Sequence, residues 1–208
     1  MGIDNEWLDL DETSAEPQPL RELVGLGPNV TGYPGGYPNG YLQFLQRKGW
    51  WGTRRLHLCS GSVADGTTVD IKRFIVTSHA AGSRTVRPTV RADLRHGVPF
   101  ADGSFDGIYI DPPYSEEKAS ELYALPLVNV PALLKEAYRV LAPSGYIVIL
   151  DLRNWGDLRP KGSTWVALHP VNTANRGAKP LRACCVFQKP KDAPIALGAP
   201  NQSRLPME

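Results

Sequence analysis

The chain has 208 residues, of which 42% are hydrophobic and 21% are charged, and its formal net charge is +2. These proportions are typical of a soluble globular protein with a core of its own. No apolar run reaches the ~18 residues that span a bilayer, and the N-terminus lacks the pattern of a secretory signal. Three cysteines are too few for a disulfide framework and their spacing does not fit a zinc site. We therefore expect buried thiols in a reducing, cytoplasmic compartment, with no membrane and no metal.

Both ends of the chain are predicted to be flexible. The first 20 residues hold six acids and no Lys or Arg, and residues 1–22 show little periodicity, which is typical of an arm. Residues 190–208 are rich in proline and form a second predicted tail, so the globular domain is expected over residues 23–189. Residues 151–208 hold nine Lys or Arg against four acids, which indicates either ordinary surface or a basic face for phosphate.

Strands and helices alternate between these ends. A loop rich in Gly and Pro over residues 32–40 leads into a short amphipathic helix that stops at Gly49. Strands are predicted over residues 55–59, 67–71, within 85–94, and over 104–110, 146–150, 165–169 and 183–187. Further helices are predicted after Ser115, a favourable N-cap, and from Pro131, with proline at the first helical position. This alternation indicates an α/β sheet protein.

The most informative segment is Asp111-Pro112-Pro113-Tyr114, which directly follows the apolar run of residues 107–110. A carboxylate, a rigid turn and an aromatic ring therefore meet at the carboxyl end of a strand, where open α/β sheets bind ligands. The prolines lack an N–H and restrict the backbone, so the carbonyls here are held as acceptors. Two acceptors beside a flat ring suit the exocyclic amine of a nucleobase. A plain strand end followed by a turn is the alternative.

With the motifs around it, this segment resembles the catalytic motif of class I S-adenosylmethionine-dependent methyltransferases of the DPPY amino-methyltransferase type. The likeness extends from about Gly32 to Lys189, and residues 98–106 and 139–145 are similar to broader methyltransferase signatures. It implies a Rossmann-like α/β fold, with a mostly parallel sheet, an antiparallel strand near the C-terminus and helices on both faces. It also implies S-adenosylmethionine as cofactor and, as substrate, adenine N6 or cytosine N4, in DNA ahead of RNA.

The resemblance also implies roles for individual residues. Within residues 57–62, which look like the first cofactor motif, Cys59, Ser60 and Gly61 would bring backbone close to the amino-acid part of the cofactor. The other implied cofactor residues are Asp70 for the ribose, Asp93 and Leu94 for the adenine, Tyr37 and Pro38 for the methionine end, and Asp111. Ordinary alternatives exist: a turn glycine at Gly61, strand-end acids at Asp70 and Asp93, and core packing for Tyr37.

The implied chemistry centres on the amino group that would receive the methyl. Asp111 and the carbonyl of Pro112 would accept its two N–H bonds and stabilise the charge that develops on nitrogen, while Tyr114 would stack on the base. Pro113 would complete the catalytic motif. The basic residues near the C-terminus are candidates for phosphate contacts: Arg153, Arg159, Lys161, Arg176, Lys179 and Arg182.

Two features depart from the family pattern. Only eight residues separate Gly61 from Asp70, whereas a parallel crossover usually needs about a dozen or more, so the first crossover helix is expected to be reduced or missing. We expect no separate domain for reading a target sequence within these residues. The alternatives are therefore an enzyme for RNA or a small amine, and a non-catalytic binding subunit; a partner subunit or a homodimer stays open.

Overall fold

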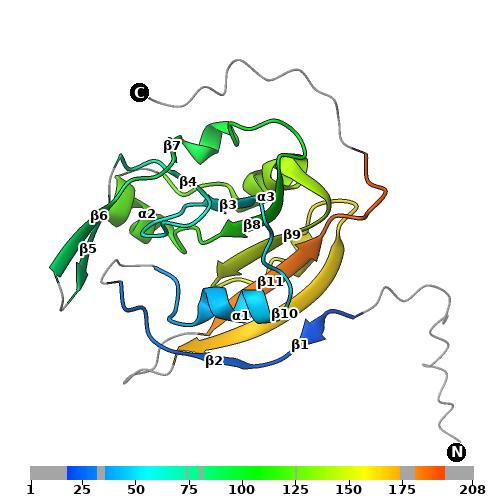
Figure 1. Cartoon of the computed structure of the whole chain (residues 1–208), viewed down its shortest axis with the longest axis horizontal. Coiled ribbons are helices and arrows are strands. Elements are labelled where there is room, and N and C mark those ends of the chain that lie inside the picture. Colours follow the sequence, from blue (N-terminus) through cyan, green and yellow to red (C-terminus); the bar gives the residue numbers. More distant parts are fainter. Residues whose placement is uncertain are drawn as a thin grey trace, which may run out of the picture.

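The computed structural model describes residues 18–31, 36–73, 75–79, 82–124, 126–173 and 181–194. A twisted nine-stranded sheet runs through this part of the chain, in the order β1-β10-β11-β9-β8-β3-β4-β7, with β2 also paired to β10 (Figure 1). Two further strands, β5 and β6, form a separate hairpin. The helices are few and lie against the faces of the sheet.

The centre of the sheet is parallel and its C-terminal part is antiparallel. The parallel strands are β3 (Arg55–Leu58), β4 (Thr67–Asp70), β7 (Val90–Arg91), β8 (Phe105–Ile110) and β9 (Leu141–Asp151). Next to β9 lies β11 (Arg182–Gln188), which is antiparallel both to β9 and to β10 (Thr164–Thr173). The short strands β1 (Leu20–Arg21) and β2 (Val24–Leu26) pair in parallel with β10. This arrangement confirms the predicted Rossmann-like fold.

Each face of the sheet carries its own core, because successive residues of a strand point to opposite faces. On β8, Ile108 and Ile110 face one core, and Tyr109 faces the other. The first core is covered by α3 (Val130–Val140), which buries Leu133, Leu134 and Ala137. The second is covered by α1 (Tyr41–Arg47), which buries Tyr41, Phe44 and Leu45.

Side-chain caps define where α2 and α3 begin. Ser115 caps α2 (Glu116–Tyr123), and its hydroxyl accepts a hydrogen bond from the backbone N–H of Lys118 at 3.2 Å. Asn129 caps α3, so Pro131 occupies the second helical position rather than the predicted first. The expected absence of a helix between β3 and β4 is confirmed, because residues 59–66 form only turns and bends.

Some boundaries differ from the prediction. β9 begins at Leu141, directly after α3, because Pro143-Ser144-Gly145 interrupts the pairing with β8 without ending the strand. The strand expected within residues 85–94 is the two-residue β7, which ends at Arg91. The hairpin of β5 (Ile75–His79) and β6 (Gly82–Val86) was not predicted.

The predicted tails lie mostly outside the described residues, namely over 1–17 and 195–208. Leu20 and Arg21, which fall within the expected arm, are strand residues paired with Ala167 and Leu168. Cys184 and Cys185 are fully buried, as predicted, whereas Cys59 is half-buried after the end of β3. Within the described ranges, no helix is long and apolar enough to cross a membrane.

Candidate functional site

The predicted site residues follow the carboxyl ends of neighbouring parallel strands. Cys59 follows β3, Asp70 ends β4, and Asp111 follows β8. Backbone hydrogen bonds tie these ends together, from Ser60 N–H to the carbonyl of Val69 at 3.1 Å and from Asp111 N–H to the carbonyl of Leu58 at 3.4 Å. The sheet therefore brings together residues that are far apart in the sequence.

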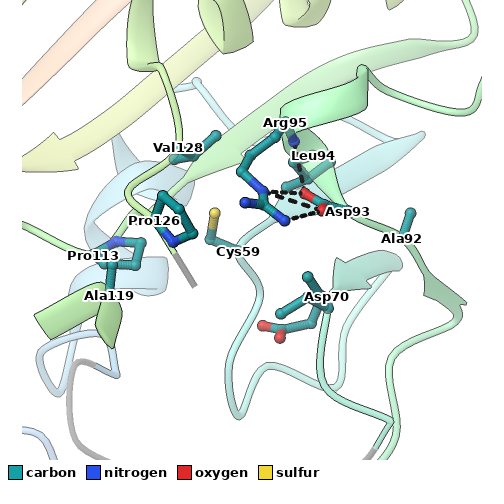
Figure 2. A pocket seen from close by; sticks show the side chains of 11 residues that line it. Cys59, Asp70, Ala92, Asp93, Leu94, Arg95, Pro113, Ala119, Pro126 and Val128 are labelled. Atoms are coloured by element: carbon teal, nitrogen blue, oxygen red, sulfur yellow. Dashed lines mark hydrogen bonds and ion pairs between the residues drawn. The ribbon is translucent and has the colours of Figure 1, made fainter. Parts of the chain in front are cut away.

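A cavity opens at this edge between β3, β4 and the segment after β7 (Figure 2). Its volume of about 60 Å³ has room for only a few water molecules. Most of the lining is apolar, and two carboxylates face it from different strands. The lining comprises Cys59, Asp70, Ile71, Ala92, Asp93, Leu94, Arg95, Pro113, Ala119, Pro126 and Val128.

Asp70 is almost completely buried, with 1% of its surface exposed. One carboxylate oxygen accepts the Gly61 N–H and the other the Lys72 N–H, each at 3.0 Å. Burial raises the pKa of Asp70, and these two backbone hydrogen bonds oppose that rise. Because an ionised carboxylate has about four acceptor positions, Asp70 keeps the capacity to bind ribose hydroxyls. Its bond to Gly61 also fixes the short crossover, where Gly61 has φ 51°.

Asp93 caps the short 3₁₀ helix Leu94–His96 and is held by Arg95. The Arg95 side chain donates to both carboxylate oxygens, at distances of 2.5 to 3.1 Å, and its backbone N–H donates at 3.0 Å. In Figure 2 the guanidinium turns back onto Asp93 within the cavity. Hydrogen bonding to Arg95 lowers the pKa of Asp93. Sequence reasoning named Asp93 and Leu94 but missed Arg95, although the Asp-x-Arg spacing was visible.

Asp111 lies near this cavity, since its charge acts on the lining residue Cys59, and Pro113, two residues later, also lines the cavity. The Asp111 side chain is 6% exposed. The Tyr114 hydroxyl donates to Asp111 Oδ1 at 2.7 Å, and Arg182 Nη1 donates to the Tyr114 hydroxyl at 2.6 Å. Arg182 Nη1 is 4.0 Å from Asp111 Oδ1. We call Asp111, Tyr114 and Arg182 the carboxylate relay.

Burial raises the pKa of Asp111 to about 7. The positive charge of Arg182 and the hydrogen bond from Tyr114 work against this rise, whereas the neighbouring carboxyl of Asp151 adds to it. Asp151 is itself held by Trp155, whose indole N–H donates to it at 2.7 Å. Asp111 is therefore a carboxyl that changes its protonation state near neutral pH.

The carboxylate relay gives Tyr114 and Arg182 contacts that were not predicted. Tyr114 was expected to act through its ring. Its hydroxyl also donates a hydrogen bond to Asp111 and accepts one from Arg182. Arg182 was expected as a surface phosphate contact, but its side chain is only 13% exposed and its guanidinium lies 5.9 Å from the Tyr114 ring centre. Of the other predicted phosphate contacts, Arg153 lies over the Trp155 ring, and Arg176 and Lys179 fall outside the described residues.

Tyr37 and Pro38 pack behind the first motif. The Tyr37 ring lies 5.1 Å from the Tyr41 ring and 6.3 Å from the His57 ring, measured between centres. Burial raises the pKa of Tyr37, and the nearby charge of Asp111 raises it further. Pro38 is buried. Tyr37 therefore lies close to Asp111, and its contact with the methionine end of the cofactor stays a prediction. Residues 32–35 lie outside the described part.

Several groups fit a bound nucleoside-like cofactor. The Ser60 hydroxyl is buried and has no hydrogen-bond partner among the described residues, so a ligand could satisfy it. Asp70 supplies a carboxylate at the end of β4, and the apolar cavity lining suits a planar ring. No group of three or more His, Cys, Asp or Glu in the described ranges could hold a metal ion.

Comparison with known families agrees with this geometry. Residues 53–149 match a family model described as "Methyltransferase domain", a stretch that runs from just before β3 into β9 and contains Asp70, Asp93 and Asp111. A search among curated proteins finds no significant match. The match and the sheet order together support a class I S-adenosylmethionine-dependent methyltransferase domain. S-adenosylmethionine is the cofactor of this family, and the residues around the cavity fit it.

Proposed function

We propose that this protein methylates an exocyclic amino group of a nucleobase, adenine N6 or cytosine N4, in DNA. The observation that carries the proposal is the buried Asp111 carboxyl, held by the relay at the end of β8 beside the cofactor cavity. A carboxylate in this place is suited to a substrate that offers N–H bonds. Bound S-adenosylmethionine supplies the methyl group on a positively charged sulfur.

The roles of the protein residues follow from hydrogen-bond chemistry. The lone pair of an aromatic amine is delocalised into its ring, so the nitrogen is a poor nucleophile. Asp111 accepts one N–H bond and the carbonyl of Pro112 the other, which localises the lone pair on the nitrogen, directs it at the methyl group and stabilises the positive charge that develops on the nitrogen. As the N–C bond formed, the methyl–sulfur bond would break to leave a neutral thioether, and the amino nitrogen would lose a proton. Asp111, with a pKa of about 7, can take it and later release it to water.

Positioning accounts for much of the expected rate. Pro113 lines the cofactor cavity, while Asp111, two residues earlier, is oriented by Tyr114 and Arg182. Holding methyl donor and amine in line can lower a barrier by several kcal/mol, about 7–11 in favourable cases. A base within a duplex must first leave the stack, at a cost of about a few kcal/mol.

The test follows radioactive methyl from S-adenosylmethionine into DNA, RNA and free nucleosides, with chromatography of the digested products. We expect N6-methyladenine or N4-methylcytosine from DNA. Asp111→Ala should abolish transfer, while cofactor affinity, measured by calorimetry, stays within about threefold because Asp111 does not line the cavity. Normal transfer by this variant, or label in RNA or a small amine alone, would contradict the proposal.

A non-catalytic binding subunit is the second candidate. It is favoured by the missing helix between β3 and β4 and by the small cavity of about 60 Å³. The same calorimetry separates the two functions. Micromolar binding of S-adenosylmethionine supports the enzyme, and no binding at millimolar cofactor supports the second candidate.

A further inference from the structure

The β5–β6 hairpin contributes none of the described residues of the methyl-transfer site. It is inserted between β4 and β7, and its two strands pair only with each other, from Ile75 opposite Val86 to His79 opposite Gly82. In Figure 1 it projects from the body of the domain on the side where α2 begins. Isolated two-stranded hairpins are marginally stable in water. The pairing of its own two strands therefore contributes little stability, and a role in binding would account for the insertion.

The hairpin and its flanks are basic. Residues 71–92 contain five Lys or Arg and no Asp or Glu, although the whole chain carries only +2. The rest of the protein is therefore net negative, and positive charge is concentrated in this insertion. Arg73, Arg84 and Arg87 are all exposed there. A segment whose charged residues are all positive attracts polyanions.

One end of the hairpin lies at the edge of the sheet that carries the site. The chain leaves β4 at Asp70 and returns through β7 to Asp93, and both acids line the cofactor cavity. The first strand of the hairpin follows Asp70, so this side of its base lies beside the site, at the carboxyl end of β4. The second strand returns to the amino end of β7, where Thr89 hydrogen-bonds to Thr68. A polyanion bound along it would be held next to the place where the methyl group is transferred.

We propose that the β5–β6 hairpin docks duplex DNA, with Arg73, Arg84 and Arg87 contacting backbone phosphates. This inference rests on the proposed function and names the surface that holds its substrate. A two-stranded ribbon fits the major groove of B-DNA, which is about 12 Å wide. The deep, narrow major groove of an RNA duplex excludes such an element.

The test compares two variants that lose the same charge. One is Arg73→Gln, Arg84→Gln, Arg87→Gln; the control is Arg47→Gln, Lys135→Gln, Lys191→Gln, at exposed positions on α1, on α3 and after β11. Binding of a labelled 20-base-pair duplex is followed by fluorescence anisotropy from 50 to 200 mM salt. We expect the hairpin variant to bind at least about tenfold more weakly and its log–log salt slope to fall by about 2 to 3. The control variant loses the same number of positive charges, but at positions away from the hairpin. Its affinity for the duplex should therefore stay within about twofold of the wild-type value.

A folding defect is detected by cofactor calorimetry, which should be unchanged in the hairpin variant. Should that variant fail to fold, Arg87→Gln alone is expected to lower the salt slope by about 1. Equal loss of affinity in both triple variants, or an RNA duplex that competes as well as DNA, would overturn the inference.

The two proposals fail in different ways. If wild-type protein methylates DNA and the hairpin variant binds it equally well, the hairpin inference is wrong and the function stands. If the hairpin variant loses DNA while Asp111→Ala still transfers methyl normally, the proposed chemistry is wrong and the docking surface stands.

Discussion

Asp93 and Asp111 each lie beside an arginine at the same edge of the sheet, yet the pKa shifts of their carboxyls are opposite. Their side chains have similar exposed fractions, 10% and 6%, but the Asp111 carboxyl lies deeper in the protein, so burial acts on it more strongly. Arg95 bonds directly to Asp93 and lowers its pKa. Arg182 lies 4.0 Å from Asp111 and donates its hydrogen bond to the Tyr114 hydroxyl instead, and burial raises the pKa of Asp111 to about 7. Hydrogen bonds from the Arg95 guanidinium therefore lower the pKa of Asp93, whereas burial raises the pKa of Asp111.

This difference suits two separate tasks. A carboxyl that stays ionised is a permanent acceptor, as binding a neutral cofactor ring requires. A carboxyl that titrates near pH 7 can accept an N–H bond and then a proton. The following predictions test this division between the two acids.

The largest effect is expected for Asp111→Asn. The amide keeps the shape but loses the charge and the ability to take a proton, so we expect kcat/KM to fall about 1,000-fold, or about 4 kcal/mol. Steady-state transfer into duplex DNA measures it. A loss below about tenfold would show that the carboxylate charge is dispensable.

The same variant should be more stable at high pH. Because the folded pKa of Asp111 lies above its unfolded value, the folded state binds more protons, and wild-type stability falls as pH rises from about 4 to about 7. Asp111→Asn removes this penalty, so we expect its free energy of unfolding to exceed the wild-type value by about 2–4 kcal/mol at pH 8. Urea unfolding at pH 5, 6 and 8 should show the gap widening with pH; a constant gap would contradict the raised pKa.

Arg182→Gln should change the pH dependence of transfer rather than its maximum. Removing the positive charge raises the pKa of Asp111 further, so less of it is ionised at pH 7. We expect about tenfold lower kcat/KM at pH 7 and recovery at pH 9. Arg153→Gln, which removes a charge from the Trp155 ring instead, is the matched control. An equal loss of kcat/KM at pH 7 and pH 9 would show that Arg182 supports the structure of the site and does not act through the pKa of Asp111.

Asp93→Ala should act on cofactor binding alone. It removes an acceptor from the cavity and the cap of the 3₁₀ helix, so we expect about tenfold weaker binding of S-adenosylmethionine. At saturating cofactor, kcat should remain within about twofold of wild type. Asp111→Asn, in contrast, should lower kcat. A large fall in kcat for Asp93→Ala would show that Asp93 also takes part in methyl transfer, so the two acids would not have separate roles.

The strongest parts of the fold were predictable because their signals are local. The continuous apolar run of residues 146–150, the cap at Ser115 and the turn chemistry of Pro112 and Pro113 each depend on neighbours in the sequence. The positions of Asp70 and Asp111 at strand ends followed from such signals.

The missed features depend on distant partners. β1 and β2 are too short to show a period and pair with β10 about 150 residues later. The β5–β6 hairpin lacks the Asn-Gly or Asp-Gly turn that marks most tight hairpins. Arg182 and Tyr114 are 68 residues apart, so their hydrogen bond becomes visible only when β11 is placed beside β9.

Tyr114→Phe should have the smallest effect and separates the hydroxyl from the ring. The phenylalanine keeps the flat face but removes the hydrogen bond that lowers the pKa of Asp111, so the acid side of the pH profile should move toward higher pH. We expect a two- to fivefold loss at pH 7, within about 1 kcal/mol, and none at pH 9. Tyr114→Leu also removes the ring and should raise KM for DNA about tenfold more if a base stacks there. If the two variants had the same KM for DNA, the hydroxyl of Tyr114 would be its functional group. Asp111 would then bind the amine of a base that does not stack on the Tyr114 ring.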